Sequence, residues 1–308
     1  MNSMDPIEIA FFKMEGCGND YVYLDLDLFK ADHRQRIEEG IENLACQIAD
    51  RHFGVGGDGL VLVAREGDHD GRMRMFNSDG SESGICGNAL RCVAKYLAEC
   101  GDEPLQSMEI HTGSGIKKTE LRWQDQRVTE VRADMGAPIF DAALIPFDAS
   151  ALPAKSRLLG GGQDSPQALE LELKGEVLPA YVLSMGNPHL VMFTDRDPLD
   201  YDLAALAAPL EQAPMFPERT NVELVQVQGK DRVLQRTFER GSGETLACGS
   251  GACAVGVAAV ARGLLSRGEA LTVDLLGGTL LIEWSEEGSV FMTGPATHVF
   301  EGVFHYQP

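Results

Sequence analysis

The sequence predicts an α/β protein made of two related halves that face each other. Its 308 residues are enough for two domains of about 150 residues each. Strand-like segments occur in both halves, bounded by Gly, Asn, Asp or Pro. Each half also carries a Gly-Asn pair before a strand and a Cys-Gly pair before a helix, namely Gly18-Asn19 with Cys86-Gly87 and Gly186-Asn187 with Cys248-Gly249. Because the order and separation of these pairs are similar, we interpret the halves as one repeated unit.

The predicted strands are short segments rich in β-branched and other apolar residues. They are Ile7–Lys13, Tyr21–Leu26, Leu60–Ala64, Met73–Phe76, Leu178–Ser184, Leu190–Phe193, Asn221–Val227, Val233–Phe238 and Gly278–Trp284.

Three segments have clear helix signals: Gln35–Ile48, Asn88–Cys100 and Ser250–Leu265. The last two begin directly after a Cys-Gly pair, so each of these cysteines is predicted at a helix N-terminus. The stretch Ala151–Gly175 has a Gly triplet, two prolines and no steady period, and it is predicted to be an exposed loop or insertion.

Composition excludes several classes of function. The chain has 26 Lys plus Arg against 47 Asp plus Glu, a net charge of −21, which repels nucleic acid and anionic membrane surfaces. The first ten residues contain no basic segment followed by an apolar one, so no signal peptide is expected and the cytoplasm is the expected location. The longest uncharged run, Leu246–Ala261, is too short to cross a bilayer and is predicted to be a buried helix.

The two Cys-Gly pairs carry the predicted chemistry. Unpaired N–H groups and the positive end of the helix dipole favour thiolate at Cys86 and Cys248, which can lower the thiol pKa. The N–H groups of the next two residues in each helix can hold a carboxylate: Gly87, Asn88, Gly249 and Ser250.

Two such sites facing each other would place the α-carbon of a bound carboxylate between two sulfurs. One thiolate could then remove the α-proton from one face while the other thiol returned a proton to the opposite face. The helix ends would stabilise the enolate-like charge, so no cofactor is expected.

Other interpretations fit less well. A metal site is not expected, since the spacings Cys86/Cys92 and Cys248/Cys253 differ from the C-x2-C pair of zinc ribbons. The segment Gly54–Gly59 matches G-x-G-x-x-G, but it follows a helix and precedes a strand, so we predict a turn rather than a dinucleotide site. The remaining five cysteines are interpreted as small buried apolar residues.

Several polar residues near these motifs suit an amino-acid substrate. Arg240 can bind a carboxylate and Glu239 an ammonium group, which together recognise a zwitterion. Asn77 and Asn221 lie at strand boundaries and could add neutral contacts, or serve only as turn residues. His189 is either structural or a modulator of a nearby thiol.

Taken together, these motifs resemble the diaminopimelate epimerase family over nearly the whole chain. The matching stretches, in family order, are 16–20, 54–59, 76–81, 86–88, 186–189, Asn221-Val222, 239–241 and 247–251. The departures are small: Ala89 stands where the family often has Gly, Ser250 where Thr is common, and Gly59 where some members have a substrate-contacting Gln.

The resemblance implies α/β architecture with mixed sheets: two pseudo-symmetric domains, each a mixed β-sheet wrapped around a central helix. We expect residues 1–135 to form the N-terminal half, residues 136–295 the C-terminal half, and a strand within 296–308 to return to the first. The resemblance also implies a homodimer.

The resemblance further implies residue roles. Cys86 and Cys248 would be the acid/base thiols, with Cys248 the acceptor and Cys86 the donor in one direction and the reverse in the other. His189 and Glu239 would modulate the thiol pKa. Substrate ligands would be Asn19, Asn77, Gly87, Asn88, Asn187, Asn221, Glu239, Arg240, Gly249 and Ser250.

The function expected from these features is an isomerase that converts LL-2,6-diaminopimelate to the meso form for lysine and peptidoglycan precursors. A racemase of another amino acid, such as histidine or glutamate, is the first alternative. A thiol-based redox sensor or amino-acid-binding module without turnover is the second.

Overall fold

The computed structural model describes residues 6–65 and 69–307. The absence of a signal peptide was predicted from a segment whose first five residues lie outside this range. The chain divides into two compact units, one formed by Met1–Ala133 with Gly294–Pro308 and the other by Asp134–Thr293. Each unit holds one of the two Cys-Gly pairs.

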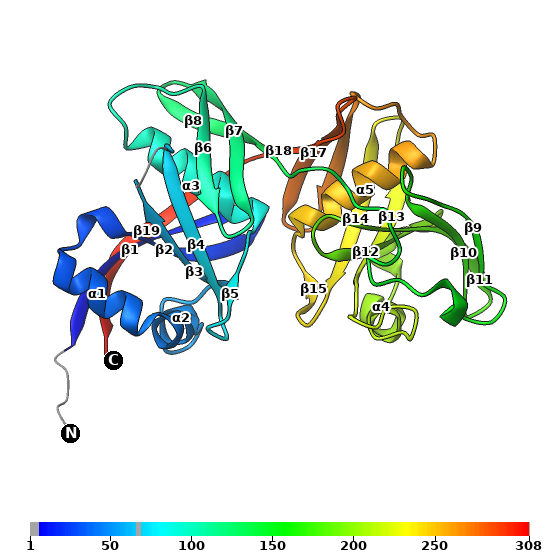
Figure 1. The fold of residues 1–308 in the computed structure, drawn as a ribbon, viewed down its shortest axis with the longest axis horizontal. Helices are drawn as coiled ribbons and strands as arrows, with labels where there is room; N and C mark the ends of the chain where they lie inside the picture. Colours follow the sequence, from blue (N-terminus) through cyan, green and yellow to red (C-terminus); the bar gives the residue numbers. More distant parts are fainter. Residues whose placement is uncertain (1–5, 66–68, 308) are drawn as a thin grey trace. The chain divides into compact units, whose positions relative to one another are not determined.

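The first unit is a mixed sheet with strand order β19-β1-β2-β3-β4-β6-β7-β8 (Figure 1). The β2–β3 and β4–β6 pairs are parallel and the others are antiparallel. The strands are β1 (Ile7–Gly16), β2 (Asn19–Asp25), β3 (Gly59–Ala64), β4 (Gly71–Asn77), β5 (Glu82–Ser83), β6 (Ser107–Thr112), β7 (Gly115–Gln124), β8 (Arg127–Asp134) and β19 (Thr297–Tyr306). The helices are η1 (Leu26–Leu28), α1 (Ala31–Glu39), α2 (Ile41–Ala49) and α3 (Gly87–Glu99).

The second unit has strand order β9-β10-β11-β12-β13-β14-β16-β17-β18. The strands are β9 (Arg157–Gly160), β10 (Gln167–Leu173), β11 (Glu176–Ser184), β12 (Pro188–Thr194), β13 (Asn221–Val227), β14 (Arg232–Glu239), β15 (Gly243–Thr245), β16 (Ala270–Leu275), β17 (Gly278–Trp284) and β18 (Val290–Gly294). The helices are η2 (Ala149–Ala151), η3 (Pro198–Asp200), α4 (Leu203–Glu211) and α5 (Gly249–Ala261).

The two units repeat one topology. From β1 to β8 and from β11 to β18, the pairs run antiparallel, parallel, antiparallel, parallel, antiparallel and antiparallel. A two- or three-residue strand, β5 or β15, pairs with β4 or β14 and leads into the central helix of its unit. The predicted fold class, two pseudo-symmetric halves of mixed sheet around a helix, is confirmed.

The central helices are buried because strands surround them. The α3 helix contacts β1, β2, β4, β6 and β7, and α5 contacts the equivalent strands β11, β12, β16 and β17 as well as β13. Ala and Gly dominate α5, and a Cβ at Gly256 would collide with Ile282 of β17. Small residues therefore let this helix pack closely against its sheet. This agrees with the buried helix that was predicted within Leu246–Ala261. No helix in the described part of the chain is long and apolar enough to span a membrane.

Two sequence predictions need correction. The helix predicted over Gln35–Ile48 is two helices, α1 and α2, that meet at Gly40, where any Cβ would collide with the Tyr306 hydroxyl. The stretch Ala151–Gly175, predicted to be a loop, contains β9 and β10, and β10 pairs with β11 along its whole length. The alternating residues Ala-Leu-Glu-Leu-Glu-Leu within β10 have the period of a strand, but the Gly triplet before them suggested a loop.

Candidate active site

Cys86 occupies the N-terminus of α3 in the first unit. Its backbone is extended, and it follows the short strand β5, which pairs antiparallel with β4. The Cys86 thiol donates a hydrogen bond to Oδ1 of Asn19, at 3.1 Å. Asn19 is the first residue of β2, so the turn between β1 and β2 brings a sequence-distant amide to the helix mouth.

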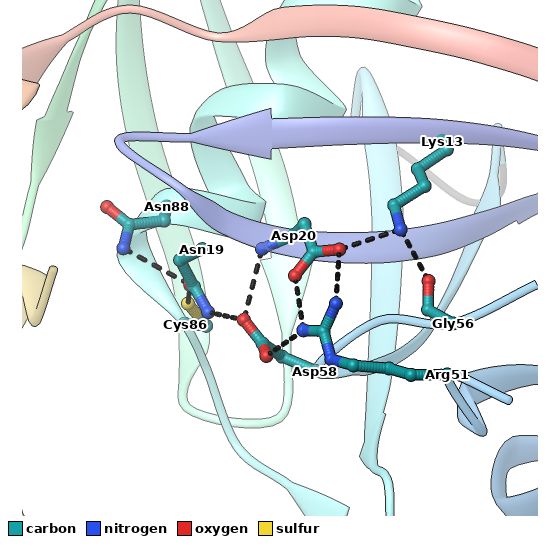
Figure 2. Close-up of polar contacts among 8 residues, drawn as sticks. All are labelled: Lys13, Asn19, Asp20, Arg51, Gly56, Asp58, Cys86 and Asn88. Atoms are coloured by element: carbon teal, nitrogen blue, oxygen red, sulfur yellow. Dashed lines mark hydrogen bonds and ion pairs between the residues drawn. The ribbon is translucent and has the colours of Figure 1, made fainter. Parts of the chain in front are cut away.

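Two further groups bind the Asn19 amide (Figure 2). Asn88 Nδ2 donates to Asn19 Oδ1 at 3.1 Å, and Asn19 Nδ2 donates to Oδ2 of Asp58 at 2.6 Å. The same Asp58 oxygen accepts the backbone N–H of Asp20 at 3.1 Å. The structure therefore joins Asn19, Asn88 and Cys86, three predicted site residues, to an aspartate that was not predicted.

Charged side chains surround Asp58, on the side of the Asn19 amide that faces away from Cys86 (Figure 2). Arg51 forms ion pairs with Asp20 at 2.7 Å and with Asp58 at 2.8 Å, and Lys13 pairs with Asp20 at 2.7 Å. Asp58 lies in the Gly54–Gly59 segment, which follows α2 and precedes β3 and is a turn, as predicted. The turn holds a carboxylate beside the candidate site.

Asn77 and Gly59 lie opposite each other in the β3–β4 pair. Asn77 Nδ2 donates to the Ser81 hydroxyl at 2.9 Å, and the Asn77 backbone N–H donates to the Ser81 carbonyl. A Cβ at Gly59 would collide with the Phe76 carbonyl oxygen, so this backbone leaves no room for a Gln at that position. In this structure Asn77 serves the turn that follows β4.

Cys248 occupies the equivalent N-terminus, that of α5. Its sulfur accepts a hydrogen bond from the backbone of its own helix. The Gly251 backbone N–H donates to the Cys248 sulfur at 3.4 Å, and the Ser250 hydroxyl lies 3.5 Å from it. The helix end that the sequence predicted to bind an anion thus directs an N–H group at this sulfur.

A chain of polar side chains leads from Ser250 into the core of the second unit. Asn187 Nδ2 donates to the Ser250 hydroxyl at 3.3 Å, and Asn187 Oδ1 lies 3.0 Å from His189 Nε2. His189 Nδ1 lies 2.8 Å from Glu223 Oε1, and both of these side chains are fully buried. The other oxygen of Glu223, Oε2, has no hydrogen-bond partner among the residues that the structure describes. Hydrogen bonds therefore link three predicted site residues, Ser250, Asn187 and His189, to the buried Glu223.

The electrostatic surroundings of Cys248 differ from the sequence prediction. Burial raises the thiol pKa well above its usual range, and the carboxylates of Glu239 and Glu223 raise it further. The helix N-terminus acts in the opposite direction, through the hydrogen bonds from Ser250 and Gly251, but these are smaller effects. Desolvation and like charge therefore outweigh the helix end.

Glu239 interacts directly with this thiol. Burial raises the pKa of its carboxyl, as does the negative charge of Glu223, whereas hydrogen bonds from Thr245 and Cys248 lower it. Thr245 donates to Glu239 Oε1 at 2.5 Å. The Glu239 carboxylate is therefore both a hydrogen-bond acceptor for the Cys248 thiol and one cause of its raised pKa.

Asn221 and Arg240 lie at one end of β13 and β14. Asn221 Nδ2 donates to the Pro188 carbonyl at 2.8 Å, and its Oδ1 accepts the Arg240 backbone N–H at 3.0 Å. The exposed Arg240 guanidinium donates to the Glu218 carbonyl at 3.1 Å. Asn221 therefore fixes the backbone that carries Arg240 and joins it to the Gly-Asn-Pro-His turn.

Sequence reasoning missed two acidic residues, Asp58 and Glu223. Glu223 is the one acidic residue within the apolar strand Asn221–Val227, an unusual position for a carboxylate and a signal that could have been used. Asp58 was hidden in a glycine-rich turn. Neither belongs to a metal cluster, since the described residues contain no group of three His, Cys, Asp or Glu side chains placed to hold a metal ion.

Comparison with known proteins agrees with the repeated topology. The family model for diaminopimelate epimerase matches residues 11–140 and 181–299. A diaminopimelate epimerase of Leptospira biflexa serovar Patoc is 43% identical over 96% of this chain and 99% of its own length. One from Acetivibrio thermocellus is 42% identical over 96% and 98%, respectively.

Solved structures share the fold at low identity. A hydroxyproline epimerase from Agrobacterium vitis aligns with a TM-score of 0.67 and 14% identity, over 99% of this chain and 93% of that one. A PhzF-family phenazine biosynthesis protein from Bacillus anthracis aligns with a TM-score of 0.65 and 18% identity, over 96% and 99%.

The carboxylates near Cys248 make a testable prediction. Glu239→Gln removes a negative charge beside the sulfur, so the thiol pKa should fall. Alkylation at neutral pH should then accelerate, about tenfold if the pKa falls by about 1. Iodoacetamide labelling of the substrate-free protein, followed by mass spectrometry of the Cys248 peptide, measures this rate. Glu244→Gln, which changes an exposed carboxylate in the adjacent strand β15, is the matched control. Equal Cys248 labelling in both variants would contradict the assignment.

Proposed function

This chain belongs to the diaminopimelate epimerase family, and from this premise we propose that it interconverts LL-2,6-diaminopimelate and meso-diaminopimelate. The observation that carries the proposal is the repeat: each unit begins its buried central helix with a Cys-Gly pair. Inverting one carbon centre requires a base and an acid on opposite faces, and two equivalent thiols satisfy that requirement.

In the proposed reaction, the thiolate of Cys248 takes the proton from the α-carbon. The electron pair of the broken C–H bond moves into the adjacent carboxylate, giving an enolate-like intermediate. The Cys86 thiol then gives its proton to the opposite face of that carbon, which leaves a thiolate at Cys86. In the reverse direction the two cysteines exchange roles.

Two hydrogen bonds support this division of roles. Cys86 donates to Asn19, which favours a protonated thiol, and Cys248 accepts from the Gly251 N–H, which offsets part of the effect by which burial raises the Cys248 pKa. Glu239 would modulate the Cys248 pKa, because its carboxylate raises that pKa and an ammonium group bound to it would offset the effect. His189 would influence Cys248 through Asn187 and Ser250.

The first-turn N–H groups of α3 and α5 are the proposed partners of the reacting carboxylate. These groups lack intrahelical partners and carry partial positive charge, so they stabilise charge that develops on the carboxylate oxygens. They belong to Gly87, Asn88, Gly249 and Ser250. This stabilisation replaces an electron-sink cofactor in the proposed mechanism.

The remaining polar residues are proposed as ligands for the amino-acid head groups. Arg240 would bind a carboxylate and Glu239 an ammonium group, as their charges and proximity in the chain suggest. The neutral contacts would come from Asn19, Asn77, Asn187 and Asn221.

We also propose that the protein is a homodimer. The edge strand β19 is bound on one side by β1, and no second strand pairs with it among the described residues. Its equivalent in the other unit, β10, is covered by β9. Val299, Phe300 and Val303 of β19 are 50%, 43% and 56% exposed, an apolar edge of the kind that pairs with another chain.

The homodimer proposal predicts that Val303→Lys, which places a charge on this edge, weakens dimerisation. Sedimentation equilibrium at several protein concentrations would measure the change. Val177→Lys, at a 53% exposed valine of β11, is the control. A wild-type chain that is monomeric at all concentrations would overturn the proposal.

The cytoplasm is the proposed location because both thiols must remain reduced to exchange protons, and that compartment keeps thiols reduced. Recovery of the native protein from an extracytoplasmic fraction would contradict this.

The two-thiol mechanism predicts that Cys86→Ala and Cys248→Ala each lower kcat by roughly 10² to 10⁴ or more, because each removes one proton-transfer group. The assay is purified protein with LL-diaminopimelate in D2O, following deuterium at the α-carbon and formation of the meso isomer. Cys100→Ala, at an exposed cysteine after α3, is the control. Near-normal turnover by either active-site variant would rule the mechanism out.

Recognition of the substrate predicts that Arg240→Lys weakens binding, since lysine keeps the charge but loses the planar fork. Loss of a charged partner for a buried carboxylate lowers affinity roughly thirty-fold or more. Lysine, which lacks the distal carboxylate, should be a very poor substrate of the wild-type protein. Parallel assays with diaminopimelate, lysine, glutamate and histidine test this. Efficient racemisation of histidine or glutamate, with diaminopimelate unchanged, would indicate the alternative racemase.

A further inference from the structure

A continuous set of hydrogen bonds crosses the first unit beneath Cys86, from Arg91 to Asp58. Arg91 Nη1 donates to Asn88 Oδ1 at 2.8 Å. Asn88 Nδ2 donates to Asn19 Oδ1, and Asn19 Nδ2 donates to Asp58. Arg91 is fully buried in α3, and its Nε also donates to the Pro295 carbonyl at 3.1 Å. Two amides therefore lie between a guanidinium and a carboxylate (Figure 2 shows the part from Asn88 to Asp58).

The charged ends determine how both amides are oriented. A guanidinium has only donors and an ionised carboxylate only acceptors. A side-chain amide has an acceptor oxygen on one side and a donor NH2 group on the other, and rotation of the amide exchanges the two. Next to Arg91, Asn88 must present its oxygen, so its NH2 faces Asn19. Next to Asp58, Asn19 must present its NH2, so its oxygen faces Asn88. Both constraints agree, and they leave Asn19 Oδ1 directed at the Cys86 thiol.

We propose that Asp58 and Arg91 are positioning residues that lock these amides, so that Asn19 presents an acceptor to Cys86 and holds it as the proton donor in the substrate-free protein. This inference rests on the proposed function, which gives Cys86 the role of an acid in one direction. Neither residue is proposed to touch the substrate.

Three titratable groups near Cys86, those of Tyr21, Tyr23 and Cys92, are neutral. Tyr21 of β2 interacts with both Cys86 and Asn19, and burial raises the pKa of its phenol, so it stays protonated. Burial also raises the pKa values of Tyr23 in β2 and Cys92 in α3, that of Cys92 to about 12. Nearby charged groups include Arg91 and Asp58, at the two ends of the hydrogen-bonded set, and the side chains that pair with Asp58 and Asp20. Asp58 is the partly exposed end, so it can be replaced without disturbing the core.

The test compares two substitutions at one position. Asp58→Ala removes both the charge and the acceptor, which frees the Asn19 amide to turn its NH2 toward the sulfur. Asp58→Asn removes the charge but keeps an oxygen that can accept from Asn19 and from the Asp20 N–H. The Asp58 side chain is 38% exposed, so neither variant opens a core cavity. Asp50→Ala is the matched control, because Asp50 lies in the same connection and its side chain accepts hydrogen bonds from the His52 and Phe53 N–H groups.

The measurement is iodoacetamide labelling of Cys86 in the substrate-free full-length chain, from neutral to alkaline pH, with mass spectrometry of the Cys86 peptide. In Asp58→Ala, labelling at neutral pH should be roughly fivefold faster than in wild type, the effect of losing one net hydrogen bond to the thiol form. Asp58→Asn should change less, and Asp50→Ala should match wild type.

Equal acceleration of labelling in Asp58→Ala and Asp58→Asn would mean that loss of the charge alone changes the reactivity of Cys86. It would overturn the proposal that Asp58 fixes the orientation of the Asn19 amide. An unchanged rate in Asp58→Ala would overturn it as well. A second readout, the pH dependence of kcat with diaminopimelate, should shift in Asp58→Ala, whereas a purely structural role would lower kcat at every pH alike. Because labelling needs no substrate, failure of the wild-type protein to epimerise diaminopimelate would reject the proposed function and leave the labelling result to judge the lock.

Discussion

A buried helix that begins at a functional site leaves its first N–H groups without backbone partners, and both central helices of this protein begin in this way. Strands surround α3 and α5, so neither helix end can be moved without unpacking a unit. Each cysteine precedes its helix by one residue, which fixes its sulfur beside those N–H groups. The folding of each unit therefore places a thiol beside a helix N-terminus.

The two sites have the same backbone but different polar surroundings. Cys86 meets an amide oxygen that Asp58 and Arg91 orient, whereas Cys248 meets N–H and hydroxyl groups with carboxylates behind them. A symmetrical pair of thiols would have no preferred acid or base. In this chain the differences come from side chains on neighbouring strands, which can diverge while the repeated topology is kept.

Acidic groups are the main electrostatic feature of the second site. Glu223 and Glu239 both raise the pKa of the Cys248 thiol, and burial of all three groups strengthens the effect because little water screens it. Glu239 itself holds a proton more tightly than an exposed glutamate does. A cationic group near these carboxylates would act in the opposite direction and favour ionisation of the thiol.

The sequence by itself determined the repeated Cys-Gly motifs, the family and the helices at Cys86 and Cys248, because these follow from local patterns along the chain. It did not determine that β10 is a strand of the sheet, since the glycines before it suggested a loop, or that Gly40 divides one predicted helix, since Tyr306 lies far along the chain. Asp58, Arg91 and Glu223 also required the tertiary structure. Hydrogen bonds between residues far apart in the chain, such as Asn19 with Asp58 and His189 with Glu223, depend on strand pairing, which no local pattern specifies.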